Sequence, residues 1–178
     1  TMYVSYPEYK MIYMLKSPKT CAVNGIEEVT NKNLHLDIPA SVEIEGNTYW
    51  VNEIFEEGFW DNSSIETVTI PDTVTRIDRG AFQGCHNLKS VYIPDSVISI
   101  GDEAFKFSYK LNTVKLSNNL IEIGNNAFLN CVSLCEIHIP NSVQKIGTNA
   151  FALCYNLTIH APAGSYAEQY AKANNIPF

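Results

Sequence analysis

Two histidines and a carboxylate near the C-terminal end are the residues of this chain best suited to hold a metal ion. Glu136, His138 and His160 would lie on neighbouring strands of one face, and two imidazoles with a carboxylate form a set that zinc accepts. Exposed histidines at the end of a fold are also ordinary surface residues, and no partners that would orient the imidazoles can be identified. The sequence therefore predicts no metal, and a zinc site is the alternative.

Other patterns that carry catalytic chemistry are missing. No glycine-rich phosphate loop, nucleophile elbow or Ser/His/Asp arrangement occurs at a recognisable spacing. The carboxylate pairs Glu27–Glu28 and Glu56–Glu57 are contiguous, so their side chains diverge and do not form a glycosidase pair. No C-x-x-C pair supports a zinc ribbon or a redox motif. We expect no enzyme and no cofactor.

Composition indicates one ordered unit. The 178 residues are 46% hydrophobic and 17% charged, which is too apolar for disorder. The net charge of −7 and the lack of a Lys/Arg cluster argue against nucleic acid and anionic membranes as partners. No apolar run approaches the roughly 18 residues that span a bilayer. No signal peptide is found at Thr1, and we expect any export signal to have been removed or to lie outside this sequence.

A period of 23 residues describes the elements that position these side chains. Phenylalanine recurs at this interval, at Phe59, Phe82, Phe105, Phe128 and Phe151. Aliphatic residues follow the first four phenylalanines at nine and eleven positions: Val68 and Ile70, Val91 and Ile93, Val114 and Leu116, Ile137 and Ile139. Self-similarity at such a period predicts a solenoid, in which each unit buries its apolar face against its neighbours.

The spacing within a unit assigns side chains to faces. Val91 and Ile93 alternate with Ser90 and Tyr92, so the first pair points inward from a short strand and the second pair points outward. Pro94 ends the strand. Because each unit returns the chain to the same edge, the equivalent strands are expected to run parallel.

Two further walls complete each turn of the solenoid, which we call a rung. Val97 and Ile100 would line the second wall, and Ala104 and Phe105 would fill the third side. A tight bend with positive φ is expected after the second wall. Asp78 occupies this position in the first regular unit, and glycine occupies it in the others: Gly101, Gly124 and Gly147.

Three cysteines share one position of the repeat. Cys85, Cys131 and Cys154 each lie three residues after a phenylalanine, and Ser108 and Asn62 take the same slot in other units. This regularity predicts small, buried side chains and free thiols. A Cys131–Cys154 disulfide is the alternative, since equivalent residues on adjacent rungs are roughly 4.8 Å apart, although stacked side chains point the same way.

The two ends do not carry the regular repeat. Residues 1–34 are expected to form an N-terminal β cap, in which strands at 10–15 and 20–23 make a hairpin. Residues 35–162 would form the solenoid, with an insertion that places a turn at 45–48 between strands at 42–43 and 49–51. Residues 163–178 would form a helical cap, because Ser165 and Glu168 make a capping box.

Two units resemble a known family. Residues 93–105 read Ile-Pro-Asp-Ser-Val-x-x-Ile-Gly-x-x-Ala-Phe, and residues 139–151 follow the same pattern with Asn in place of Asp. These units, and the ending Ala-Gly-Ser-Tyr-Ala-Glu-Gln-Tyr-Ala at 163–171, are similar to BspA-type leucine-rich repeats. Ser117 in place of Pro and the stretched unit at 39–58 depart from the pattern.

The resemblance implies a right-handed leucine-rich-repeat solenoid with short parallel strands. It also implies a bacterial cell-surface or secreted protein. Some members are adhesins that bind host matrix proteins or other bacteria, and the family has no catalytic residues to carry over.

The outward face of the strands is the predicted binding surface. Positions two before each proline slot form one row: Asp37, Thr69, Tyr92, Lys115, His138 and His160. Positions four before form a second row: His35, Thr67, Ser90, Thr113, Glu136 and Thr158. We predict that a protein or glycan binds the central part of both rows: Ser90, Tyr92, Thr113, Lys115, Glu136 and His138. The alternative for most of these positions is an ordinary exposed strand surface.

Two classes of function remain. The first is an adhesin-like binding module, and the second is a structural or spacer unit that stacks within a larger surface assembly. An exposed aromatic cluster on adjacent rungs would favour binding, whereas an uncovered apolar end would favour stacking.

Overall fold

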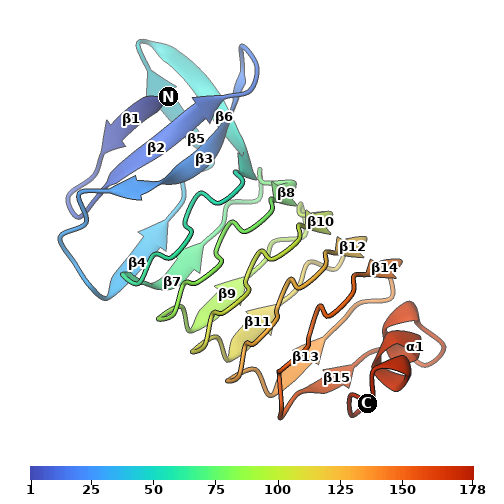
Figure 1. The fold of residues 1–178 in the computed structure, drawn as a ribbon. Coiled ribbons are helices and arrows are strands. Elements are labelled where there is room, and N and C mark those ends of the chain that lie inside the picture. Colours follow the sequence, from blue (N-terminus) through green and yellow to red (C-terminus); the bar gives the residue numbers. More distant parts are fainter.

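The chain winds into a solenoid whose rungs lie side by side (Figure 1). A computed structural model describes residues 1–178. One wall is a six-stranded parallel sheet in the order β15-β13-β11-β9-β7-β4. Its strands are β4 (Leu34–Asp37), β7 (Ile65–Thr69), β9 (Ser90–Tyr92), β11 (Thr113–Lys115), β13 (Glu136–His138) and β15 (Thr158–His160). Each belongs to a successive rung, and β7, β9, β11 and β13 recur at the predicted period of 23 residues.

The opposite wall is a nine-stranded sheet in which the N-terminal strands continue into the solenoid. It contains β1 (Met2–Ser5), β2 (Lys10–Leu15), β3 (Thr20–Glu27), β5 (Ser41–Ile44), β6 (Asn47–Ile54), β8 (Arg76–Ile77), β10 (Ser99–Ile100), β12 (Glu122–Ile123) and β14 (Lys145–Ile146). The predicted hairpin is β2 with β3, and the predicted insertion is the antiparallel pair β5 and β6. Parallel pairing of β3 with β6 joins the N-terminal strands to the rungs, a long-range pairing that the sequence pattern does not contain.

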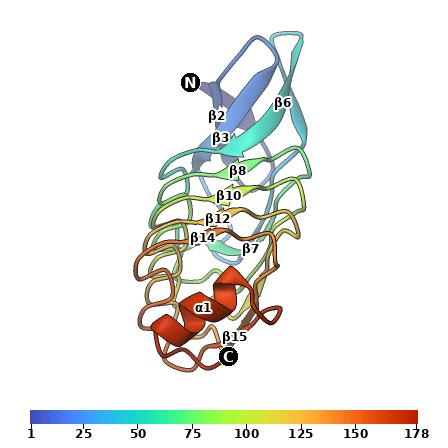
Figure 2. The same cartoon turned by 90° about the vertical axis from the view of Figure 1, so that its right-hand side faces the viewer.

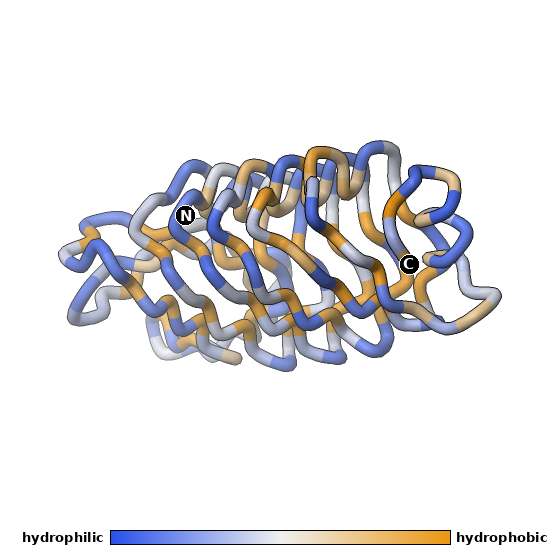
Figure 3. Tube along the Cα trace, turned by 90° about the horizontal axis from the view of Figure 1, so that it is seen from below, coloured by the Kyte–Doolittle hydropathy of each residue, from blue (hydrophilic) through white to orange (hydrophobic).

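Stacked phenylalanine rings fill the third side of the coil. Neighbouring rings from Phe59 to Phe151 lie 5.1–5.4 Å apart between centroids, with interplanar angles of 3–11°. All five rings are buried. Figure 3 shows the repeated alternation of hydrophobic and hydrophilic segments along the rungs. The apolar positions of the period therefore make one continuous core, as predicted.

The glycine ladder has a different cause from the one expected. Gly101, Gly124 and Gly147 do not have positive φ. A Cβ added at Gly124 would instead lie 2.4 Å from the backbone nitrogen of Asp102, one rung away, and the other two glycines are similarly crowded. Asp78, in the same slot of the first unit, also lacks positive φ. Glycine is therefore required by close approach of two rungs, and the predicted left-handed bend at this position was wrong.

Positive φ occurs at two other positions of the period. The first series is Glu57, Gly80, Glu103, Asn126 and Asn149, and the second is Asp61, Gly84, Phe107, Asn130 and Leu153. Glycine and asparagine suit this conformation, whereas a large apolar side chain is strained there. Phe107 and Leu153, with φ of 63° and 62°, are the strained members.

The cysteine ladder is held by hydrogen bonds as well as by packing. All five cysteines are free, so the Cys131–Cys154 disulfide does not form. The thiols of Cys85, Cys131 and Cys154 each donate to a phenylalanine carbonyl 26 residues earlier, at 3.2 Å. Ser108 makes the same bond to Phe82 with its hydroxyl. In these four units the slot therefore holds a small side chain that donates one hydrogen bond, whereas the side chain of Asn62 accepts one from the backbone N–H of Ser64.

The helix α1 (Tyr166–Ala173) covers the C-terminal end of the coil (Figure 2). Ser165 caps it by accepting from the backbone N–H of Glu168, as the capping box predicts. The carboxylate of Glu168 accepts from the backbone N–H of Gly164, next to the cap, whereas a capping box would place this bond on the cap residue itself. Tyr170 packs edge-on against Phe151, with ring centroids 6.1 Å apart. No helix has the length and apolar character needed to cross a membrane.

Candidate functional site

The predicted row of outward side chains lies in direct register on the six-stranded sheet. Tyr92 pairs with Thr69 on one side and with Lys115 on the other. Lys115 pairs with His138, and His138 pairs with His160. The parallel ladder thus places these residues next to one another on one face, as the spacing predicts. We call the outward surface of this sheet the strand face.

The second row runs beside the first. Ser90 pairs with Thr67 and with Thr113, and Glu136 pairs with Thr158. Ser90 is half-buried, whereas Thr113 and Glu136 are exposed. The six residues predicted to bind a ligand therefore share one surface on the consecutive strands β9, β11 and β13.

Two shallow hollows flank this surface where the strands end. The Tyr92 hollow, of about 410 Å³, lies between Tyr92, Pro94 and Lys115. The His138 hollow, of about 670 Å³, lies between Lys115, His138 and Pro162. Lys115 lines both, so the two hollows follow one edge of the strand face. Tyr92 is 59% exposed and projects its ring beside the first hollow.

Hydrogen bonds secure this edge at the rung that lacks the usual proline. Ser117 is buried in the proline slot, and its hydroxyl accepts from the backbone N–H of Asn119. The side chain of Asn119 donates to the Asp95 carbonyl at 2.9 Å. Hydrogen bonds from the backbone and side chain of Asn118 lower the pKa of Asp95. The turn thus keeps its shape without proline.

The N-terminal part of the strand face already has its polar groups paired. The two ring nitrogens of His35 are hydrogen-bonded to the hydroxyls of Thr67 and Thr69. These bonds orient the imidazole along its neighbouring strand. His35 is therefore less available to a ligand than the tyrosine and lysine at the centre of the face.

The C-terminal part brings together the three residues considered for a metal. The rings of His138 and His160 stack with centroids 4.7 Å apart and an interplanar angle of 19°. Nε2 of His160 lies 3.8 Å from a carboxylate oxygen of Glu136. One potential ligand atom from each of the three residues lies within 4.8 Å of the others, and all three side chains are exposed.

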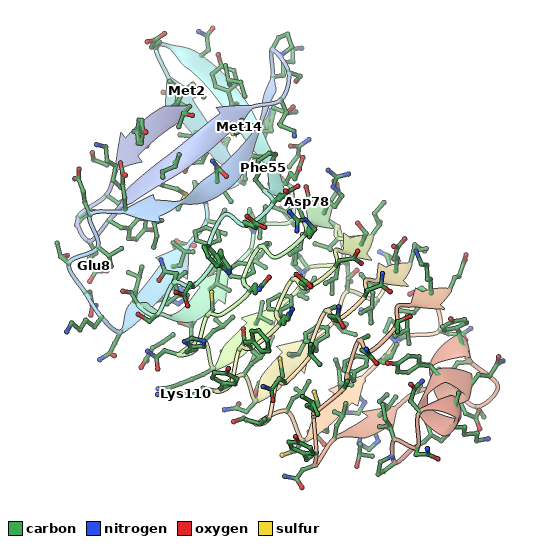
Figure 4. All side chains as sticks on the ribbon, viewed as in Figure 1. Met2, Glu8, Met14, Phe55, Asp78 and Lys110 are labelled. Carbon is green, nitrogen blue, oxygen red and sulfur yellow. The ribbon has the colours of Figure 1, made fainter.

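An aromatic row on a different surface was not predicted. It occupies the position four residues after the repeat phenylalanine in three of the five units, where His86 stacks on Tyr109 at 4.9 Å between centroids; Ser63 and Val132 take this position in the other two units. Tyr155 takes the same position two rungs later and is 74% exposed. Lys110 projects from this edge of the solenoid (Figure 4). The 23-residue period contains the signal for this row, because the position recurs at that interval.

A family model covers most of the chain. The model of the BspA type leucine rich repeat region matches residues 52–171 with six copies. No curated protein matches the chain.

Solved structures of bacterial leucine-rich-repeat proteins are similar to this fold. A leucine rich repeat protein of T. pallidum has a TM-score of 0.74 at 28% identity, over 84% of this chain and 67% of its own. A Bacteroides capillosus leucine-rich repeat protein has a TM-score of 0.54 at 31% identity, over 90% of this chain and 99% of its own.

A leucine rich cell surface protein of Faecalibacterium prausnitzii has a TM-score of 0.50 at 27% identity, over 90% of this chain. This chain spans only 55% of that protein. The shared feature is the repeat itself, whose phenylalanine stack and parallel strands are described above. This chain belongs to the BspA-type leucine-rich repeat family.

Proposed function

We propose that this protein is a non-enzymatic, adhesin-like binding module, located on a bacterial cell surface or secreted, that presents its strand face to a protein or glycan. The observation that carries the proposal is the exposed row of Tyr92, Lys115 and His138, whose backbones pair in direct register. A sheet holds these side chains at fixed spacing, so a ligand meets a largely preorganised surface.

The chemistry of the row suits a polar ligand. Tyr92 offers an apolar ring with a polar tip, and Lys115 offers a positive charge between two hollows. Ser90 and Thr113 add hydroxyls beside them. Such a surface can stack on a sugar ring or an apolar side chain while it hydrogen-bonds to neighbouring polar groups. A host matrix protein is one candidate ligand of this kind.

The covered C-terminal end supports binding over the alternative role as a stacking spacer. Ala167 and Ala171 of α1 are buried against the coil, and Tyr170 closes the phenylalanine stack. A unit that stacks on its neighbours would leave this apolar end open. The location rests on the family and on the Faecalibacterium neighbour, which is named a cell surface protein.

The test begins with an array of glycans and matrix proteins, which identifies a ligand for the wild-type protein. The double variant Tyr92→Ala/Lys115→Glu is then compared with wild type by surface plasmon resonance. Loss of a hot-spot tyrosine is expected to cost about 2 kcal/mol, which is roughly a 30-fold increase in Kd. Both side chains are exposed, so the variant should keep the wild-type melting temperature.

The matched control is Tyr155→Ala/Lys145→Glu. It makes the same two chemical changes at side chains that are 74% and 64% exposed and lie off the strand face. We expect it to bind as wild type does. Equal affinity of the strand-face variant and wild type would refute the proposed surface, and the N-terminal hairpin and the insertion at 43–51 would be tested next.

A further inference from the structure

We propose that Glu136, His138 and His160 bind a first-row divalent transition-metal ion, for which Zn²⁺ is the probe. The three residues lie at the C-terminal end of the strand face, on β13 and β15. Their arrangement follows from backbone pairing and does not require that the face bind a protein or glycan. The site is therefore a separate inference with its own test.

The backbone brings the three side chains to one place. His138 and His160 are direct partners in the parallel pair of β13 and β15. Glu136 lies two residues before His138 on the same strand, so it projects from the same face. Directly paired residues are about 4.8 Å apart, and residues i and i+2 are about 7 Å apart, a gap that a glutamate side chain can span. The sheet thus places three potential metal ligands, two imidazoles and one carboxylate, next to one another.

The distances require only a small adjustment. Zinc bonds of about 2.0–2.2 Å in tetrahedral geometry place two ligand atoms about 3.3–3.5 Å apart. His160 and Glu136 are already 3.8 Å apart, and all three ligand atoms lie within 4.8 Å of one another. The remaining closure is about 1 Å or less per side chain. The stacked His138 and His160 rings must also turn out of their stack so that a nitrogen of each points at the ion, and rotation of these exposed side chains supplies both changes without movement of the strands.

The donor set selects the class of metal. Imidazole nitrogens suit zinc, copper and nickel, and one carboxylate completes a mixed set that zinc uses in proteins. Calcium requires six to eight oxygen ligands, and this cluster offers one carboxylate. The cluster therefore favours transition metals over calcium and magnesium.

The exposure of the three side chains affects both the affinity for the metal ion and the coordination position that the protein leaves free. The ring nitrogens of His138 and His160 make no hydrogen bond to a protein group, so no hydrogen bond orients either imidazole. We therefore expect zinc to bind about 10- to 100-fold more weakly than in sites whose imidazoles are oriented by further hydrogen bonds. Three protein ligands leave the fourth tetrahedral position to water, or to a donor atom from a bound partner.

The test uses tag-free, full-chain protein that has been treated with a chelator and titrated with ZnCl₂ by isothermal calorimetry. We expect one equivalent to bind, and no binding of CaCl₂ over the same range. His138→Ala and His160→Ala should each weaken zinc binding by more than about tenfold, and Glu136→Gln should weaken it as well. These exposed substitutions should leave the melting temperature unchanged without metal.

Two control variants separate this cluster from other donors. His86→Ala removes a histidine that lies elsewhere and should leave the zinc affinity unchanged. Cys135→Ser removes the one exposed thiol, next to Glu136 in the sequence, and should also leave it unchanged. The proposal is wrong if wild type shows no saturable zinc binding, if the His138 and His160 variants bind as wild type does, or if Cys135→Ser abolishes binding. None of these results bears on the Tyr92 and Lys115 experiment.

Discussion

Replacement of Gly124 by alanine tests whether close approach of the rungs is what requires glycine. The added Cβ would lie 2.4 Å from the Asp102 nitrogen and 2.5 Å from the Gly101 carbonyl carbon, whereas ordinary contacts begin near 3.4 Å. The rungs would have to separate locally by about 1 Å. Both obstructing atoms belong to backbone, so no side chain can rotate to relieve the contact.

The cost follows from what this separation disturbs. Overpacking of a well-packed interior costs about 1–3 kcal/mol. Two hydrogen bonds cross the same gap, from Gly124 N to Ile100 O at 2.8 Å and from Asn125 N to Asp102 Oδ1 at 2.7 Å. Each contributes about 1 kcal/mol, so the free energy of unfolding should fall by about 3–5 kcal/mol.

Gly46→Ala is the matched comparison. Gly46 has φ of +77° and no heavy atom within 4 Å of an added Cβ, so its substitution carries the conformational cost alone, about 1–2 kcal/mol. Thermal unfolding followed by circular dichroism should show Gly124→Ala melting roughly 10 °C below wild type and Gly46→Ala roughly 4 °C below. If Gly124→Ala melts no lower than Gly46→Ala, close approach is not the reason for the glycine ladder.

Four further outcomes are expected. Ile93→Asp should prevent folding, because Ile93 is buried and an unpaired carboxylate in the core costs several kcal/mol; an unchanged circular dichroism melt would contradict the assignment of the strand faces. Iodoacetamide should label exposed Cys135 rapidly in native protein and spare the buried cysteine ladder, and mass spectrometry that finds the ladder labelled as fast would overturn its burial. Burial raises the pKa of Cys85 to about 12 and that of Cys154 to about 11, from an ordinary value of 9.0. These thiols therefore ionise at a lower pH in the unfolded chain than in the folded protein, and this favours unfolding at high pH. The midpoint of urea unfolding should fall as the pH rises above about 9, and a midpoint that stays constant to pH 10 would count against this linkage. Leu153→Asn should raise the melting temperature, since Leu153 is exposed with φ of 62° and asparagine relieves about 1 kcal/mol of strain; a lower melting temperature would show that the leucine side chain contributes more than its backbone costs.

The spacing of residues along the chain was enough to predict the rungs and the strand face. Residues that recur at one period occupy equivalent places in a solenoid, because each unit contacts mainly its neighbours. The order of apolar and polar residues in a single unit therefore predicts burial in the others. This is why the register of Tyr92, Lys115 and His138, and the burial of the phenylalanine stack, could be read from spacing alone.

Features that depend on distances between rungs or on long-range strand pairing could be found only in the folded protein. Gly124 was expected to allow a positive φ, but glycine is needed there because the backbone of Asp102 lies too close for a Cβ. Only the distance between the two backbones distinguishes a conformational cause from a steric one. The parallel pairing of β3 with β6 joins segments that carry no repeat, so no period predicts it. The cluster of His138, His160 and Glu136 required side-chain positions, since spacing places three residues on one face without fixing how closely their ligand atoms approach. A repeating sequence specifies which residues are neighbours, and packing in three dimensions specifies how near they come.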